Sequence, residues 1–249
     1  NVDLDYCRSK NIAVCNVVGY STDSVAQTTV ASALYLFNHL PEFTRHVRDG
    51  KYTDGGVANC LSPVFHEISG KTWGIVGCGN IGAKVARVAE ALGCKIIVNK
   101  RTPSDEFETV DIDTLCKESD IISLHCPLTK ENHHIINSEA FDKMKNGVYV
   151  LNTSRGGLID SNALIDALKS GKVGGAALDV YEEEGDMFFE DMSDETDRDE
   201  KMATLLSMPN VLITSHQAFL TNEALENIAQ TTLDNISTFF KNNKIKNVN

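Results

Sequence analysis

The sequence predicts an α/β fold built on a doubly wound, parallel sheet of the Rossmann type. Three observations support this prediction. Short runs rich in apolar and β-branched residues alternate with segments of helical periodicity. A glycine-rich turn lies between the first strong strand and the helix that follows it. Polar and charged residues stand directly after several later strands, at the edge where an open parallel sheet binds its ligands.

The predicted strands are short and apolar, and helical periodicity follows most of them. The strands cover residues 72–76, 94–98, 121–124, 148–151, 175–178 and 211–213, and the helices cover residues 81–92, 112–116, 161–169 and 225–239. Upstream, residues 12–17 are predicted to form another strand. Thr22 or Ser24 can cap a long helix that Pro41 ends or kinks near residue 40. Residues 50–62, rich in glycine, asparagine and aspartate, are predicted to form a connector.

The net charge of −12 is concentrated in one segment. Between Glu182 and Glu200 there are eleven acidic residues and one basic residue, Arg198, so the rest of the chain is nearly neutral. A nucleic-acid-binding protein needs a basic surface, so this charge distribution argues against that function. We interpret the acidic segment as one solvated insertion.

The cysteines and the apolar runs indicate the cellular compartment of the protein and whether it binds a metal or a membrane. Seven cysteines, an odd number without any C-x-x-C spacing, predict reduced thiols in a cytoplasmic protein. Ligands with the spacing of a zinc site are not visible in the sequence, so no metal is predicted. No apolar run approaches the roughly 18 residues of a membrane helix. Residues 1–5 do not have the pattern of a signal peptide, so no membrane partner is predicted.

The glycine-rich turn, Gly77-Cys78-Gly79-Asn80-Ile81-Gly82, has the G-x-G-x-x-G pattern. It follows a predicted strand, opens a helix and precedes a second strand, which is the context of a dinucleotide site. The first glycine permits the tight turn, the second permits close approach of a pyrophosphate, and the third permits close packing of helix and strand. The helix N-terminus, at Asn80 and Ile81, then presents N–H groups to the phosphates.

The end of the second strand is where such a site reads the ribose. An NAD site usually places an acidic residue there, but the sequence has Asn99-Lys100-Arg101-Thr102. Lysine and arginine at this place would attract a 2′-phosphate through charge-assisted hydrogen bonds. The sequence therefore predicts NAD or NADP as cofactor, with NADP(H) favoured by Lys100 and Arg101.

Three later strand ends carry a set of residues suited to acid–base chemistry on a carboxylate substrate. Arg155 follows the strand at 148–151, acidic residues between Asp179 and Glu184 follow the next strand, and His216 follows the last. An arginine can bind a carboxylate at two points, and a histidine can deliver a proton near neutral pH. A carboxylate behind the histidine fixes its ring. This set, beyond a dinucleotide loop, predicts reduction of a 2-keto acid.

Several of these motifs resemble the D-2-hydroxyacid dehydrogenase family over almost the whole chain. They are the glycine turn, His125-Cys126-Pro127-Leu128-Thr129, and residues 152–160, 177–182 and 216–219. Residues 181–193, with Phe188-Phe189-Glu190-Asp191, and residues 210–220 are similar to the fermentative D-lactate dehydrogenase branch. In that branch the ribose position usually holds an aspartate, so Lys100 is a departure from the pattern.

The resemblance implies a role for each candidate site residue. Arg155 would bind the substrate carboxylate and His216 would be the acid/base. Glu184 would be the partner of His216, because it lies five residues past Asp179 as the family's glutamate does. The other implied contacts are with the nicotinamide, from Asp179, Thr153, Ser154 and Pro127, and with the substrate, from Tyr20.

The resemblance also implies the domain organisation. Residues 1–20 would end a flavodoxin-like substrate domain, residues 21–222 would form the dinucleotide-binding domain, and residues 223–249 would return as a helix to the substrate domain. The sequence begins well inside such enzymes, so only a remnant of the substrate domain is expected. A homodimer is expected, with the helix at residues 24–40 as a contact.

Two questions stay open at this point. Pyruvate is the first candidate substrate, but a bulkier or different acid such as phenylpyruvate, hydroxypyruvate or glyoxylate fits the same motifs. A different class is a non-catalytic, dinucleotide-sensing protein similar to the C-terminal-binding corepressors, which resemble the same family. The acidic insertion and the absence of a basic or low-complexity tail in this sequence argue against that class.

Overall fold

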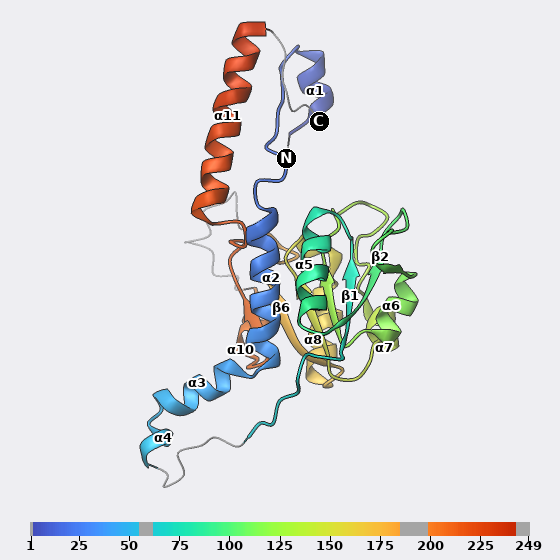
Figure 1. Cartoon of the computed structure of the whole chain (residues 1–249), viewed down its shortest axis with the longest axis vertical. Helices are drawn as coiled ribbons and strands as arrows, with labels where there is room; N and C mark the ends of the chain where they lie inside the picture. The colour runs from blue at the N-terminus through green and yellow to red at the C-terminus, as the bar shows by residue number, and fades with distance from the viewer. Residues whose placement is uncertain (1, 55–61, 185–198, 243–249) are drawn as a thin grey trace. The chain divides into compact units, whose positions relative to one another are not determined.

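The computed structural model describes residues 2–54, 62–184 and 199–242. The chain divides into two compact units (Figure 1). One unit consists of Asn1–Ser24 and Phe219–Asn249, and the other consists of Val25–Ala218. None of the described helices combines the length and the apolar character that a membrane span requires.

The larger unit is built on a seven-stranded sheet in which every neighbouring pair is parallel. The strand order is β3-β2-β1-β4-β5-β6-β7, so the winding direction reverses between β1 and β4. The predicted doubly wound parallel sheet is therefore confirmed. The strands are β1 (Thr72–Val76), β2 (Lys95–Asn99), β3 (Glu108–Thr109), β4 (Ile121–Leu124), β5 (Val148–Asn152), β6 (Val173–Leu178) and β7 (Val211–Ile213).

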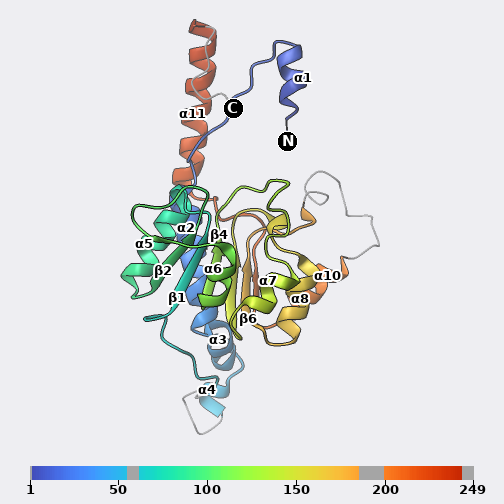
Figure 2. The same ribbon diagram turned by 90° about the vertical axis from the view of Figure 1, so that its right-hand side faces the viewer.

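Helices cover both faces of this sheet (Figure 2). Buried side chains of α6 (Ile112–Glu118), α7 (Ser138–Lys143), α8 (Ser161–Lys169) and α10 (Glu200–Ser207) form one apolar core with the sheet. Those of α2 (Thr22–Phe37) and α5 (Asn80–Ala91) form a second core on the other face. The strands supply both cores because successive side chains point to opposite faces. In β4, for example, Ile121 packs in the second core and Ile122 in the first.

Short elements join these layers. The turn η1 (Gly156–Leu158) follows β5, and α3 (Leu40–Arg48) and α4 (Lys51–Asp54) follow α2. The long helix that was predicted to end near residue 40 ends earlier, at Phe37, because His39 adopts a left-handed backbone conformation with φ of 50°. Pro41 then stands in the first turn of α3, where its missing N–H costs no hydrogen bond. The predicted connector at residues 50–62 contains the helix α4, and residues 55–61 lie outside the described part.

The smaller unit contains α1 (Leu4–Ser9), the first residues of α2, and α11 (Asn222–Asn242). The strand predicted at residues 12–17 is wrong, because these residues form no ladder. The alternation of Ile12, Val14 and other apolar residues is compatible with a strand, but a strand needs a neighbour for its N–H and C=O groups. Within the described part of this unit, no second extended segment pairs with it.

Candidate functional site

All the candidate residues of the larger unit follow the carboxyl ends of parallel strands. Gly77 follows β1, Lys100 follows β2, and His125 follows β4. Arg155, Asp179 and His216 follow β5, β6 and β7. Because the strands are parallel, these segments meet at one edge of the sheet, and β1 and β4 flank the point where the winding reverses. Open α/β sheets bind their ligands in the crevice at this place.

A groove of about 560 Å³ opens between the ends of β1, β2 and β4. Burial raises the pKa of the Cys78 and Cys126 thiols, so both are uncharged at neutral pH and do not oppose an anionic ligand. The side chains and backbone that line the groove are those of Val76, Gly77, Cys78, Gly79, Asn99, Lys100, Arg101, Thr102, His125, Cys126, Pro127, Thr129, Glu131, Asn132 and Ile135.

The three glycines of the turn differ in what surrounds them. Gly77 has a positive φ of 91°, and a Cβ there would lie 2.5 Å from the backbone nitrogen of Cys126. A Cβ on Gly82 would lie 2.2 Å from the carbonyl oxygen of Gly77. Gly79 has nothing within 4 Å of its Cβ position. Helix α5 begins at Asn80, and its N-cap residue, Gly79, has no side chain to cap it, so its first N–H groups are available to an anion.

This contrast gives a matched pair of variants. We expect Gly82→Ala to destabilise the fold by about 1–3 kcal/mol, because the added methyl group overlaps a backbone oxygen. We expect Gly79→Ala to leave the melting temperature nearly unchanged and yet to weaken NADH binding, because the methyl group fills space that a pyrophosphate would use. Thermal unfolding and NADH fluorescence titration measure the two effects. Normal NADH affinity in a folded Gly79→Ala protein would place the phosphates elsewhere.

Two cations follow β2 directly. Lys100 and Arg101 both line the groove. Glu106, in the loop after β2, accepts two hydrogen bonds of 2.7 Å from Arg87, and this bond holds its pKa below the usual value. Asn99 donates its side-chain N–H to the carbonyl oxygen of Val110 at 3.0 Å. The ribose end of the groove is therefore cationic.

A second cavity, of about 350 Å³, lies beside β6 and β7 and contains the candidate acid–base pair. His216 Nδ1 lies 3.3 Å from Glu184 Oε1. The other oxygen of Glu184 accepts the backbone N–H of Tyr181 at 3.1 Å, which fixes the carboxylate. The residues that line this cavity are Asp179, Tyr181, Glu184, Met202, Leu206, Ile213, Thr214, Ser215 and His216.

The buried carboxylate of Asp179 organises the loop that carries His216. Its Oδ1 accepts hydrogen bonds from the Thr214 hydroxyl at 2.5 Å and the Gln217 N–H at 3.0 Å. Its Oδ2 accepts the Ala218 N–H at 2.9 Å. The carbonyl oxygen of Asp179 accepts the backbone N–H of His216 at 2.7 Å. These bonds hold His216 in a left-handed conformation, with φ of 51°. The predicted contact of Asp179 with a nicotinamide stays a prediction.

Arg155 lies at the sheet edge but not in direct contact with the pair. Its side chain is exposed, and its guanidinium donates to the carbonyl oxygen of Ser154 at 2.6 Å. Asn152, buried at the end of β5, donates its side-chain N–H to the carbonyl oxygen of Arg155 at 2.8 Å and fixes the turn. Among the described residues Arg155 has no acidic partner, so its guanidinium is available to a ligand carboxylate.

The two residues before Arg155 are held by neighbouring segments. The Ser154 hydroxyl donates to the carbonyl oxygen of Cys126 at 2.7 Å. The hydroxyl of Thr153 lies 2.8 Å from that of the buried Thr29, and Thr29 donates to the carbonyl oxygen of Val25. Since Thr29 has one hydroxyl proton, Thr153 is the donor in this pair, and the lone pairs of its oxygen remain to accept a hydrogen bond.

Some residues of the site were not predicted from the sequence. His125 lines the groove, and burial lowers its pKa to about 3, so its ring is neutral. The motif that contains His125 was visible, but nothing local indicated its burial. Met202 and Leu206 line the second cavity from α10, which follows the acidic segment and had no strong periodic signal. Tyr20 belongs to the smaller unit, where its ring contacts Phe219 edge to face, and its predicted role stays a prediction.

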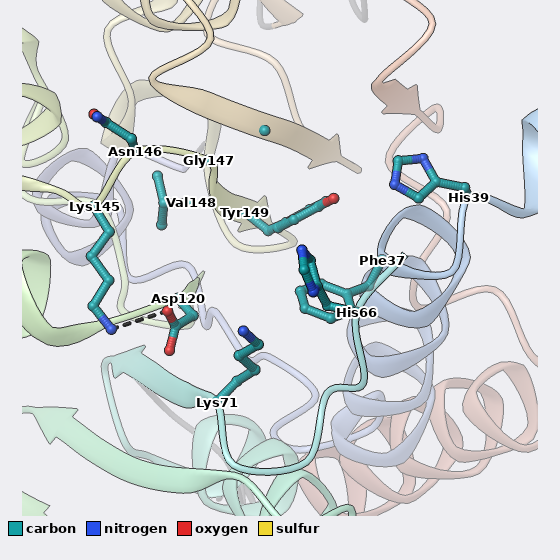
Figure 3. A pocket seen from close by; sticks show the side chains of 11 residues that line it. Phe37, His39, His66, Lys71, Asp120, Lys145, Asn146, Gly147, Val148 and Tyr149 are labelled. Carbon is teal, nitrogen blue, oxygen red and sulfur yellow. Dashed lines mark hydrogen bonds and ion pairs between the residues drawn. The ribbon is translucent and has the colours of Figure 1, made fainter. Parts of the chain in front are cut away.

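A third cavity, of about 310 Å³, lies at the opposite edge of the sheet (Figure 3). Some of its polar side chains stand just before strands and form hydrogen bonds or ion pairs that connect neighbouring strands. Asp120 accepts the backbone N–H of Thr72 at 2.8 Å and is paired with Lys145 at 3.0 Å. The rings of Phe37, His66 and Tyr149 also line this cavity. Ligands of open α/β sheets bind at the carboxyl edge, so we do not assign the reaction to this cavity.

The parallel sheet, the glycine turn and the groove at the winding reversal define a dinucleotide-binding protein of the Rossmann type. The sequence profile of the D-isomer specific 2-hydroxyacid dehydrogenase family, NAD binding domain, matches residues 30–218. The chain is 42% identical to D-lactate dehydrogenase of Escherichia coli strain K12 over 246 residues, which are 97% of this chain and 73% of that protein.

Two solved structures have the same fold and similar sequences. The pyruvate reductase of Chlamydomonas reinhardtii superposes with a TM-score of 0.88 and 41% identity, covering 99% of this chain and 74% of that chain. D-Lactate dehydrogenase with NAD⁺ from Lactobacillus jensenii gives a TM-score of 0.87 and 32% identity, covering 100% of this chain and 74% of that chain. The chain therefore belongs to the D-isomer specific 2-hydroxyacid dehydrogenase family, and it is an NAD-dependent oxidoreductase.

Proposed function

We propose that the protein interconverts pyruvate and D-lactate, with His216 as the acid/base, Glu184 as its partner and Arg155 as the carboxylate-binding residue. One observation carries the proposal most directly. His216 Nδ1 and Glu184 Oε1 are 3.3 Å apart at the sheet edge that also holds the glycine turn. The names of the relatives, D-lactate dehydrogenase and pyruvate reductase, support pyruvate as the substrate.

The chain's own residues fit a dinucleotide. The open space at Gly79, the uncapped start of α5 and the cations after β2 form a cradle of suitable shape and charge. When bound, the nicotinamide supplies the hydride that reduces the carbonyl carbon. The predicted nicotinamide contacts from Pro127, Thr153, Ser154 and Asp179 belong to this proposal.

The acid–base pair accounts for the proton that reduction requires. With Nδ1 directed to Glu184, His216 would deliver a proton from Nε2 to the carbonyl oxygen of the substrate. The Glu184 carboxylate holds the ring and favours its charged form. Arg155 would hold the substrate carboxylate at two points and so orient the carbonyl group for reaction.

A panel of 2-keto acids tests the substrate. We expect pyruvate to give a higher kcat/KM than phenylpyruvate, hydroxypyruvate or glyoxylate with NADH as the reductant. A much higher kcat/KM for phenylpyruvate would show that the substrate is a bulkier keto acid than pyruvate. No turnover of any of these acids, with NADH binding intact, would favour the dinucleotide-sensing, corepressor-like class instead.

We also propose that Lys100 and Arg101 allow the enzyme to use NADP(H). The double variant Lys100→Asp with Arg101→Pro is expected to weaken NADPH binding about 10- to 100-fold more than NADH binding, since hydrogen bonds to charged groups contribute roughly 1.5–3 kcal/mol. Fluorescence titration with both cofactors measures the difference. Lys169→Asp, an exposed change on α8, controls for overall charge. Equal losses for both cofactors would remove the 2′-phosphate argument.

Three further expectations belong with this proposal. A homodimer, a cytoplasmic location and the approach of Tyr20 to the substrate remain predictions from the sequence. Sedimentation of the purified protein would measure the oligomeric state.

A further inference from the structure

A cluster of metal-binding side chains lies outside the groove and the acid–base cavity. His133, His134 and Glu182 each offer a ligand atom, and these atoms all lie within 4.8 Å of one another. His133 and His134 belong to the loop after β4, and Glu182 follows β6. The sequence spacing did not reveal the cluster, because the fold joins two segments separated by nearly fifty residues.

The backbone fixes the histidine loop before any ligand binds. The N–H of His134 donates to the carbonyl oxygen of Gly157 at 2.9 Å, and the N–H of Ile136 donates to that of Leu158 at 3.1 Å. His134 has a positive φ of 53°, and the rings of His133 and His134 lie with their centroids 3.9 Å apart and their planes inclined by 32°. The two imidazoles therefore point to the same side of the loop.

Glu182 is held in a similar way. One of its carboxylate oxygens accepts the backbone N–H of Ser161, the first residue of α8, at 3.1 Å. The other oxygen contacts Nε2 of His134. A carboxylate oxygen that is held in this way beside two imidazoles is a suitable ligand for a cation.

An outer carboxylate completes the arrangement. Oδ2 of Asp160 lies 4.0 Å from Nδ1 of His134, the ring nitrogen that does not contact Glu182. Histidines that bind metals commonly direct their second nitrogen to a carboxylate, which fixes the ring and strengthens the ligand. Two histidines and one carboxylate, with a fourth position open to water, match the ligand set of a zinc site with three protein ligands.

We propose that His133, His134 and Glu182 bind a divalent transition-metal ion, with Zn²⁺ as the preferred ion. Tetrahedral coordination with bonds of about 2.0–2.2 Å requires the ligand atoms to draw closer together. The exposed side chain of His133 can rotate to achieve this. The ion replaces the direct contact between His134 and Glu182. Mixed imidazole and carboxylate ligands favour zinc over calcium and magnesium, which prefer oxygen alone.

Isothermal titration of the untagged, EDTA-treated full chain with Zn²⁺ tests the proposal. We expect saturable binding, and we expect His133→Ala and Glu182→Gln each to weaken it at least about tenfold, since loss of even an outer partner costs roughly 10- to 100-fold. His66→Ala removes an exposed histidine elsewhere, and Glu183→Gln removes the adjacent acid. Both controls should bind Zn²⁺ like the parent protein.

Cobalt substitution separates this cluster from the cysteines. A Co²⁺ spectrum without thiolate charge-transfer bands, and loss of that spectrum in His133→Ala, would support imidazole and carboxylate ligands. Thiolate bands, an unchanged Zn²⁺ isotherm in both ligand variants, or no saturable binding would overturn the proposal. Because His133 is exposed, its variant should keep the melting temperature of the metal-free parent, which shows that a loss of binding is not a loss of folding.

Discussion

His216→Ala should lower kcat for pyruvate reduction by about 10²- to 10⁴-fold, the usual contribution of a general acid. The structure gives the reason. His216 is held by backbone bonds to Asp179 and Thr214, and its Nδ1 faces Glu184, so the substitution removes the positioned group that would donate the proton. Steady-state NADH oxidation with saturating pyruvate measures the effect.

Three controls sharpen this test. NADH binding by His216→Ala should equal that of the parent, because His216 does not line the dinucleotide groove. Glu184→Gln should lower kcat less than His216→Ala, since the ring remains and keeps a hydrogen-bond partner. His66→Ala, on the opposite edge of the sheet, should have little effect on pyruvate kinetics. An unchanged rate in His216→Ala would show that another group delivers the proton.

The sequence predicted the sheet well because its signals are local. β1, β4, β7 and α8 have the predicted bounds, since a short apolar run between turn residues, or a capped periodic segment, specifies each of them. Asp160, for example, caps α8 by accepting two backbone N–H groups. The strand expected at residues 12–17 failed because strand formation depends on a partner that the local sequence does not contain.

The candidate site shows the same limit. Three consecutive glutamates follow β6, and the residue pattern alone could not separate their roles. In the structure Glu182 contacts His134, Glu183 pairs with Lys201, and Glu184 pairs with His216. Each partner comes from a different segment, so only the folded chain distinguishes the three. Most of the acidic insertion that follows, residues 185–198, lies outside the described part of the chain.

The glycine turn was more predictable than the acid–base pair for a physical reason. A positive φ at Gly77 and a missing side chain at Gly82 are requirements of the backbone within a few residues, so they leave a mark on the sequence. Glu184 follows β6 and His216 follows β7. The sequence of either segment alone does not specify the distance between these two side chains. The resemblance to a known family, not the pattern itself, selected Glu184.

Arg155→Gln should lower kcat/KM for pyruvate by about 10²-fold, the cost of misplacing a bound substrate by roughly 1 Å, because the carboxylate loses the residue that orients it. The variant should keep the parent's melting temperature, because Arg155 is exposed and, within the described part of the chain, its guanidinium donates only to the carbonyl oxygen of Ser154. Arg155→Lys should recover part of the loss, since it restores the charge but not the planar fork. Lys169→Gln, which removes a distant positive charge, serves as the control. If Arg155→Gln and Lys169→Gln gave equal kcat/KM values, the substrate carboxylate would have to be bound by a different residue.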